Sequence, residues 1–163
     1  TLRIEELYDR YAHLVYRRCL MLLGNTAQAE DALQEVFVKA MRAAESFRGD
    51  SSPSTWLYRI STNHCLNVIR SSKRLRKRLE RRAAEREVLA TAIPADQMEA
   101  AAQIRELLPH FDERTQRMAV YYFVDGMSQD EIAEQVGASV PTVRKYLKKF
   151  VEKSNKRLEG AKR

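Results

Sequence analysis

Apolar residues recur at helical spacing along most of the chain, and no segment alternates apolar and polar residues as a half-buried strand does. Each of the five glycines follows the end of a periodic apolar stretch, where a helix can stop. The pattern predicts helices over residues 4–22, 27–45, 96–108 and 113–124, a long helix beginning near Pro53, and a helix pair within residues 126–147. We therefore expect an all-α fold.

The pair at residues 126–147 carries start and stop signals that agree with one another. Ser128 can cap the first helix while Glu131 bonds back to it, and Gly137 can take the left-handed conformation that ends it. Ser139 can cap the second helix. This spacing predicts a helix-turn-helix, with an ordinary helical hairpin in a core as the alternative.

The second helix of the pair is one-sided in charge. Val143 and Leu147 continue an apolar stripe, and Pro141 falls in the first turn, where a missing amide hydrogen costs little. The opposite face carries the polar and cationic residues Thr142, Arg144, Lys145, Lys148 and Lys149. A helix that packs on one side and is cationic on the other is typical of a DNA-reading helix.

The net charge of +7 is concentrated in two blocks. Residues 70–86 hold nine basic and two acidic side chains, and residues 144–163 hold the same numbers. The stretch between them, residues 87–143, holds three basic and ten acidic ones. A charge run is usually a solvated face, but two separate cationic blocks favour two contacts with a phosphate backbone.

The first half of the chain has two further polar surfaces. On the predicted helix 27–45, an outward face contains an apolar residue, as a protein contact surface would; its members are Asp31, Gln34, Glu35 and Val38. The helix that follows carries a polar and cationic track made of Arg59, Asn63, Arg70, Arg74 and Lys77. The loop over residues 46–54, which precedes that helix, offers an aromatic ring and hydroxyls to an unstacked base. Trp56 lies on the apolar side of the same helix, so a position in the core is favoured over a role in separating DNA strands.

Residues 83–95 are rich in alanine and weakly periodic, which predicts a flexible linker. The expected domains are then residues 1–82 and 96–163. Asp96 and Glu99 can form a capping box at the start of the second domain.

The composition argues against several classes of protein. His13, His64 and His110 lie in separate contexts, and no spacing of histidine, cysteine or carboxylates resembles a metal site, so we expect no metal, cofactor or catalysis. Cys19 and Cys65 fit buried free thiols. No apolar run reaches the roughly 20 residues that span a bilayer, and there is no signal-peptide layout, so we expect no membrane insertion and a cytoplasmic protein.

Several strings together make the chain resemble a bacterial RNA polymerase sigma factor of the extracytoplasmic-function (ECF) class. In the first half these are AEDALQEVF at 29–37, FRGD at 47–50 and TWLYRI at 55–60; in the second they are LP at 108–109, GMS at 126–128, EIA at 131–133 and SVPTVR at 139–144. The resemblance covers almost the whole length. It implies a core-polymerase and −10 domain followed by a −35 domain.

The resemblance also implies a role for each surface. Core polymerase would bind Asp31, Gln34, Glu35 and Val38. The −10 element, including its melted non-template strand, would meet Phe47, Arg48, Ser51, Ser54, Arg59, Asn63, Arg70 and Arg74. The double-stranded −35 element would meet Ser139, Pro141, Thr142, Arg144, Lys145 and Lys148. The family's usual control implies a separate anti-sigma factor that occludes the polymerase-binding surfaces.

Two other functions are compatible with parts of the pattern. A conventional helix-turn-helix regulator would bind its operator without polymerase, and the face containing Asp31 and Glu35 argues against it. An enzyme acting on nucleic acid would need a catalytic constellation that the sequence lacks.

Overall fold

The computed structural model describes residues 2–78 and 93–162, except for the side chains of residues 73–78. Every regular element in these residues is helical, as the periodicity predicted. The contacts divide the chain into two compact units, Thr1–Ala102 and Gln103–Arg163. Residues 83–92 of the predicted linker lie outside the described residues, so the linker and the domain limits stay predictions.

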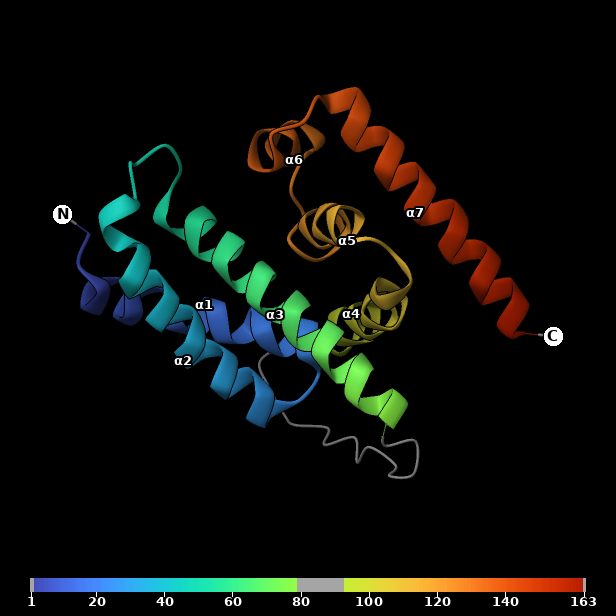
Figure 1. The fold of residues 1–163 in the computed structure, drawn as a ribbon, viewed down its shortest axis with the longest axis horizontal. Coiled ribbons are helices and arrows are strands. Elements are labelled where there is room, and N and C mark those ends of the chain that lie inside the picture. The colour runs from blue at the N-terminus through green and yellow to red at the C-terminus, as the bar shows by residue number, and fades with distance from the viewer. Residues whose placement is uncertain (1, 79–92, 163) are drawn as a thin grey trace. The chain divides into compact units, whose positions relative to one another are not determined.

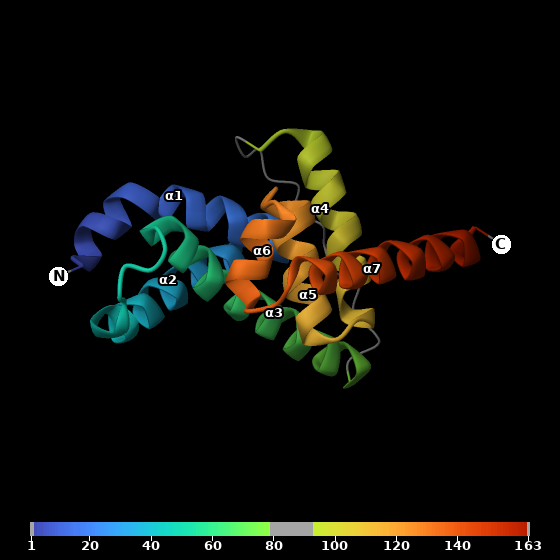
Figure 2. The same ribbon diagram turned by 90° about the horizontal axis from the view of Figure 1, so that it is seen from above.

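Three helices build the first unit: α1 (Ile4–Leu23), α2 (Thr26–Ala43) and α3 (Pro53–Arg78). Gly24 ends α1 with a φ of 68°, and the Asn25 side chain accepts a hydrogen bond from the Gln28 amide to start α2. The two helices therefore reverse direction within two residues. All three helices contact one another, and Figures 1 and 2 show them side by side.

A short 3-10 turn, Ala44–Ser46, follows α2, and the loop after it leads to α3. The Ser52 hydroxyl accepts a hydrogen bond from the Thr55 amide, with 3.2 Å between the two atoms. Ser52 thus caps α3 and Pro53 occupies its first turn, where proline is preorganised for a helix. The start near Pro53 agrees with the prediction from the sequence.

The centre of the first unit is filled by side chains from all three helices. Val15 and Cys19 of α1, Val36 of α2, and Leu57 and Cys65 of α3 are fully buried. Both cysteines are free thiols, as the sequence predicted. Trp56 is 5% exposed, which confirms the interpretation that it belongs to the core.

Arg18 is a buried cation that the sequence pattern did not reveal; its residue is 4% exposed. Its guanidinium donates to the Tyr58 carbonyl at 3.0 Å, to the Ser61 hydroxyl at 2.5 Å and to the Thr62 hydroxyl. It also lies over the Tyr58 ring, 4.8 Å from the centroid. Arg18 therefore ties α1 to three polar groups within about one turn of α3, because a buried charge must find hydrogen-bond partners.

Helix α4 (Ala95–Leu107) spans the division between the two units in the sequence and is followed by the 3-10 turn Leu108–His110, which contains Pro109. The predicted capping box is wrong. Asp96 lies inside the first turn of α4, one residue after its start, and the Pro94 carbonyl accepts the first helical hydrogen bond, from Met98. Because Pro94, with its fixed φ, immediately precedes α4 and its carbonyl opens the helix, the cap falls two residues before the predicted one at Asp96.

Helix α5 (Glu113–Ala119) is capped by Asp112 and continues as a π-helical turn over Val120–Val124. The sequence predicted one regular helix over residues 113–124. The wider turn changes which residues face outward, and Tyr122 and Phe123 are 39% and 41% exposed while Tyr121 is buried. Periodicity over so few residues cannot distinguish the two kinds of turn.

The helix-turn-helix follows as α6 (Gln129–Val136) and α7 (Val140–Ala161). A small core holds the two helices against α5; its members are Met118, Tyr121, Ile132, Ala133, Val143 and Leu147. Ala133 of α6 and Val143 of α7 both lie in this core. Met127, just before α6, packs against the same cluster and helps to fix the entry to the helix.

Replacing Arg18 by methionine, which keeps much of its length, should lower the free energy of unfolding of the first unit. Each buried polar group that loses its partner costs about 1–3 kcal/mol. Urea unfolding followed by the fluorescence of Trp56, the only tryptophan of the chain, reports on this unit. The exposed Arg10→Met is the control and should cost less than about 1 kcal/mol; equal losses in both variants would contradict the prediction.

Candidate DNA and polymerase interfaces

The helix-turn-helix is fixed by hydrogen bonds at each helix end. The Ser128 hydroxyl accepts from the Glu131 amide at 3.2 Å, and the Glu131 carboxylate accepts from the Ser128 amide at 2.7 Å. Gly137 closes α6 with a φ of 65°, and the Ser139 hydroxyl accepts from the Thr142 amide at 3.3 Å to open α7. All four signals read from the sequence are confirmed, and together they set the angle at which α7 leaves the turn.

Helix α7 presents its cations to solvent. Arg144, Lys145 and Lys148 are exposed, whereas Val143 and Leu147, on the other side, are buried. Ser139 and Pro141 are exposed and Thr142 is half-buried. The Ser139 and Thr142 hydroxyls lie 2.8 Å apart and hydrogen-bond to each other, so both take part in the N-terminal cap of α7. In helix-turn-helix proteins bound to DNA, the N-terminal end of the second helix contacts the bases.

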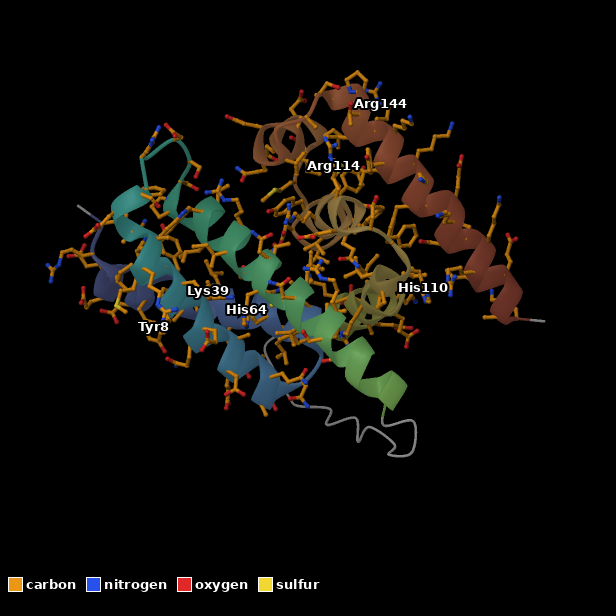
Figure 3. All side chains as sticks on the ribbon, in the orientation of Figure 1. Tyr8, Lys39, His64, His110, Arg114 and Arg144 are labelled. Atoms are coloured by element: carbon orange, nitrogen blue, oxygen red, sulfur yellow. The ribbon has the colours of Figure 1, made fainter. Side chains whose placement is uncertain are left out.

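Two contacts brace cationic side chains of the second unit, and neither was found from the sequence. Arg144 donates from Nε to Oε1 of Gln129 at 3.4 Å, and the Arg114 guanidinium lies 5.3 Å from the centroid of the Tyr146 ring. Figure 3 labels both arginines. Each contact joins residues from different helices, so only the folded arrangement reveals it.

In the first unit, the outward face of α2 is exposed as the sequence predicted. Asp31, Gln34 and Glu35 are exposed, and Val38 is half-buried. Carboxylates and an amide surround a partly covered apolar residue here. Such a mixed surface is compatible with solvent and can also bind a protein partner.

The same side of α2 is joined to α3 by Lys39 and His64, which Figure 3 shows close together. Lys39 Nζ lies 2.9 Å from Nδ1 of His64, and both residues are half-buried. Burial, followed by the positive charge of Lys39, lowers the pKa of His64, and the Glu35 carboxylate partly opposes this. A neutral ring can accept the hydrogen bond that the lysine donates.

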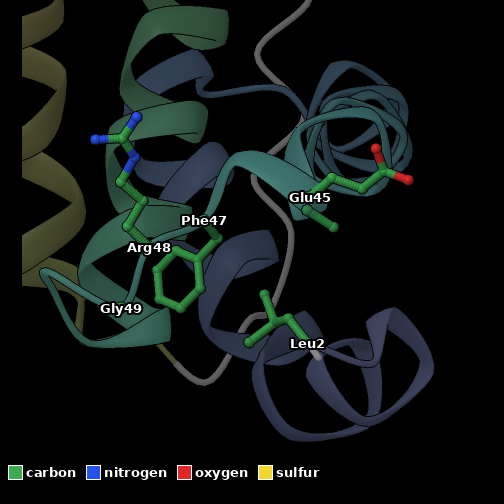
Figure 4. Close-up of a pocket in the computed structure, with 6 residues that line it drawn as sticks. Leu2, Glu45, Phe47, Arg48 and Gly49 are labelled. Carbon is green, nitrogen blue, oxygen red and sulfur yellow. The ribbon is translucent and has the colours of Figure 1, made fainter.

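The loop between α2 and α3 borders an open pocket, drawn in Figure 4, that is lined by Leu2, Ala44, Glu45, Phe47, Arg48 and Gly49. Phe47 is half-buried and its ring centroid lies 5.1 Å from that of Trp56, so the ring is held in place by the core. Arg48 is exposed. Ser51 and Ser54 are half-buried, and the Ser54 hydroxyl hydrogen-bonds with that of Ser52 at 2.9 Å.

The polar track on α3 is less uniform than the sequence suggested. Arg59 is exposed, whereas Asn63 is half-buried, and no described residue donates a hydrogen bond to its buried Oδ1. Arg70 is half-buried and donates to Oδ1 of Asn67, one turn away. Arg74 lies in α3, and its side chain is outside the described part of the chain.

Comparison with known families explains why these surfaces occur together. Residues 7–75 match the family described as Sigma-70 region 2, and residues 101–153 match Sigma-70, region 4. The chain belongs to the ECF family of RNA polymerase sigma factors. It therefore directs transcription initiation through regions 2 and 4, which lie in the first and second halves of the chain.

Curated relatives carry the same name over most of the chain. SigW of Bacillus subtilis is 29% identical over 94% of this chain and 87% of its own length. The sigma-E factor of Escherichia coli is 34% identical over 70% of this chain and 65% of its own. Both are described as ECF RNA polymerase sigma factors, which agrees with the resemblance seen in the sequence.

Two solved structures share the fold. RpoE of Bartonella quintana, crystallised with the anti-sigma factor NepR, has a TM-score of 0.61 at 16% identity and covers 95% of this chain and 96% of its own. CnrH, solved with the cytosolic domain of CnrY, has a TM-score of 0.59 at 22% identity and covers 96% of this chain and 88% of its own. At these identities the likeness extends to the fold alone.

Membership of this family excludes the two alternatives drawn from the sequence. Sigma factors are non-catalytic subunits, so the chain is not an enzyme, and they act with polymerase, unlike a conventional regulator. Over residues 2–78 and 93–162 there is no cluster of side chains suited to a metal ion. No helix in the same residues is long and apolar enough to cross a membrane.

Acidification should destabilise the first unit through His64. Because its pKa is lowered in the folded state, the unfolded chain takes up the proton at higher pH. The resulting stability is complete above the ordinary histidine pKa of about 6.5 and declines as the pH falls below it. Urea unfolding followed by Trp56 fluorescence at several pH values should show this decline, and His64→Gln should reduce it.

His13→Gln is the matched control, because His13 is an exposed histidine of the same unit. If both variants lost the same part of the pH dependence, the decline could not be assigned to the contact between Lys39 and His64.

Proposed function

We propose that the surfaces of the two units divide the work of promoter recognition as follows. The α2 face of Asp31, Gln34, Glu35 and Val38 binds core RNA polymerase, the loop and α3 bind the −10 element, and α7 binds the −35 element. The observation that supports this division is that each surface has exposed polar or charged members, Asp31 and Glu35 on α2, Arg48 and Arg59 at the loop and α3, and Arg144 and Lys148 on α7, within the region 2 or region 4 match that holds it. The chain has no polymerase activity of its own, so it must hold enzyme and promoter at once.

For the −10 element we infer capture of an unpaired base of the non-template strand beside Phe47. A ring already packed against Trp56 offers a base a rigid stacking partner, and stacking is worth about 1–3 kcal/mol per base. Arg48 in the loop and Arg59 on α3 are exposed and can meet phosphates. Ser51, Ser54, Asn63, Arg70 and Arg74 complete the proposed −10 surface.

For the −35 element we infer that α7 enters the major groove by its capped end. Arg144 lies one turn from the cap and is the candidate for base readout, whereas Lys148, one turn further, is the candidate for a phosphate contact. Lys145 is exposed between them and supports either role. Ser139, Pro141 and Thr142 form the end of the helix that approaches the DNA.

We also propose that an anti-sigma factor controls the chain by covering the polymerase-binding surface. The support is that two proteins of the same fold, RpoE and CnrH, were solved in complexes, RpoE with an anti-sigma factor and CnrH with the cytosolic domain of CnrY. The proposed working place is the cytoplasm, where a bacterial polymerase meets its promoters.

Reversing the charge of the α2 face with Asp31→Lys and Glu35→Lys together should abolish binding to core polymerase. Both side chains are exposed, so the fold should lose no more than about 0.5 kcal/mol per substitution. Binding is measured by co-purification or by a titration with core enzyme. Glu5→Lys with Asp9→Lys, an exposed pair at the same spacing on α1, is the control; equal affinity in both double variants would refute the assignment.

Replacing Arg144 or Lys148 by alanine should separate base readout from phosphate binding. Loss of a bidentate base contact costs about 1–3 kcal/mol and relaxes preference at one base pair. Loss of a phosphate contact weakens all sequences alike and reduces the salt dependence. Transcription from a set of −35 variants at two salt concentrations distinguishes these effects. If neither variant changes preference or salt dependence, α7 does not read the −35 element.

A further inference from the structure

Gln129 supports Arg144 from the other helix of the helix-turn-helix. Gln129 is the first residue of α6, and Arg144 lies in the second turn of α7, 15 positions later. The Gln129 side-chain oxygen accepts a hydrogen bond from Arg144 Nε at 3.4 Å. Gln129 is half-buried, whereas Arg144 is exposed. The glutamine is thus the better fixed of the two side chains.

The start of α6 holds Gln129 in place. The reciprocal hydrogen bonds between Ser128 and Glu131 fix the backbone on both sides of it, and Ile132 buries the same turn in the core. Since its backbone is fixed, the Gln129 amide has only its own torsions with which to move. It can therefore act as a fixed acceptor for a longer and more mobile arginine.

The contact leaves a defined part of the guanidinium for DNA. Arginine has five N–H donors in a planar fork, and Nε carries one of them. With Nε engaged by Gln129, the two terminal nitrogens form the edge that remains, and two parallel donors match O6 and N7 of guanine. Because the acceptor is a neutral amide, the positive charge of Arg144 is retained for the DNA, whereas a carboxylate would neutralise it.

We propose that Gln129 is a positioning residue for −35 recognition, which orients Arg144 so that its terminal nitrogens meet one base pair. This inference rests on the base-reading role proposed for Arg144. Gln129 itself need not touch DNA. Gln129 should increase the preference for one base over the other three. An arginine held in one orientation loses less conformational freedom on binding and can hydrogen-bond to fewer of the alternative bases.

The first test compares two substitutions of Gln129 by transcription from promoters that carry every base at each −35 position. Gln129→Met keeps the length and removes the acceptor, so it should reduce the preference at the base pair read by Arg144 by about 3- to 10-fold. This is a part of the roughly 5- to 150-fold that a complete bidentate contact provides. The salt dependence should stay as in wild type, because no phosphate contact is lost.

Gln129→Glu keeps an acceptor oxygen and adds a negative charge. It should retain the base preference while weakening binding to all −35 sequences, because the carboxylate neutralises part of the cationic surface. Gln135→Ala, which changes a glutamine of the same helix, is the control and should leave the preference intact. A loss of preference in Gln129→Glu equal to that in Gln129→Met would overturn the proposal.

A double-mutant cycle then tests whether Gln129 acts through Arg144. In an Arg144→Ala background, Gln129→Met should cause no further loss, since the side chain that it positions is gone. If the two losses multiply, Gln129 contacts DNA directly and the inference is wrong. It is also wrong if Arg144→Ala relaxes the preference and Gln129→Met does not, a result that would leave the proposed role of Arg144 in place.

If Arg144→Ala leaves the preference unchanged, the proposed base readout fails and the positioning role fails with it. Thermal unfolding followed by circular dichroism accompanies each variant, because an unchanged transition shows that the helix-turn-helix is intact. The core polymerase used is one that the wild-type chain activates.

Discussion

A helix as short as α6 has only marginal stability by itself in water. The geometry of the second unit therefore depends on the hydrogen bonds that fix both ends of α6. Its eight residues form too few internal hydrogen bonds to offset the cost of nucleation. The hydrogen bonds between Ser128 and Glu131 satisfy backbone amides at the first end. At the other end, the left-handed conformation of Gly137 lets the amides of Gly137 and Ala138 both donate to the Ala133 carbonyl. Only with α6 fixed does the core around Ile132 define the direction of α7, and only then does Gln129 face Arg144.

This dependence explains why the second unit was predicted well from sequence. Helix caps act between residues three or four positions apart, so the residue types alone reveal them, and Ser128, Gly137 and Ser139 each did what their chemistry indicates. The predicted cap at Asp96 failed for the same local reason. Pro94, two residues earlier, provides an equally good helix start, and a single sequence does not say which of two adequate signals is used.

Contacts between distant residues were not predictable in this way. Arg18 looks like one more polar residue on α1, and its burial follows only from the hydroxyls of Ser61 and Thr62 some 40 positions later. The contacts of Lys39 with His64 and of Arg144 with Gln129 are likewise set by how helices cross. The π-helical turn at Val120–Val124 is local, but the sequence pattern does not reveal it. A single such turn shifts the apolar positions by about one residue, which is within the ordinary irregularity of a helical pattern. The roles of the site residues came from the family resemblance, because exposure alone does not say what a surface binds.

The charges of the second unit also restrict how it can approach DNA. Acidic side chains lie on its first three helices; those described as exposed include Glu106, Asp112, Glu113, Asp130, Glu131 and Glu134. The cations instead gather on α7, where Arg144, Lys145, Lys148 and Lys149 are exposed. An orientation that brings α6, with its three exposed carboxylates and no basic residue, against a phosphate backbone meets like-charge repulsion, whereas the α7 side is attracted. If α7 reads DNA as proposed, the carboxylates of α6 favour that orientation without contacting DNA, because they disfavour encounters through the opposite helix.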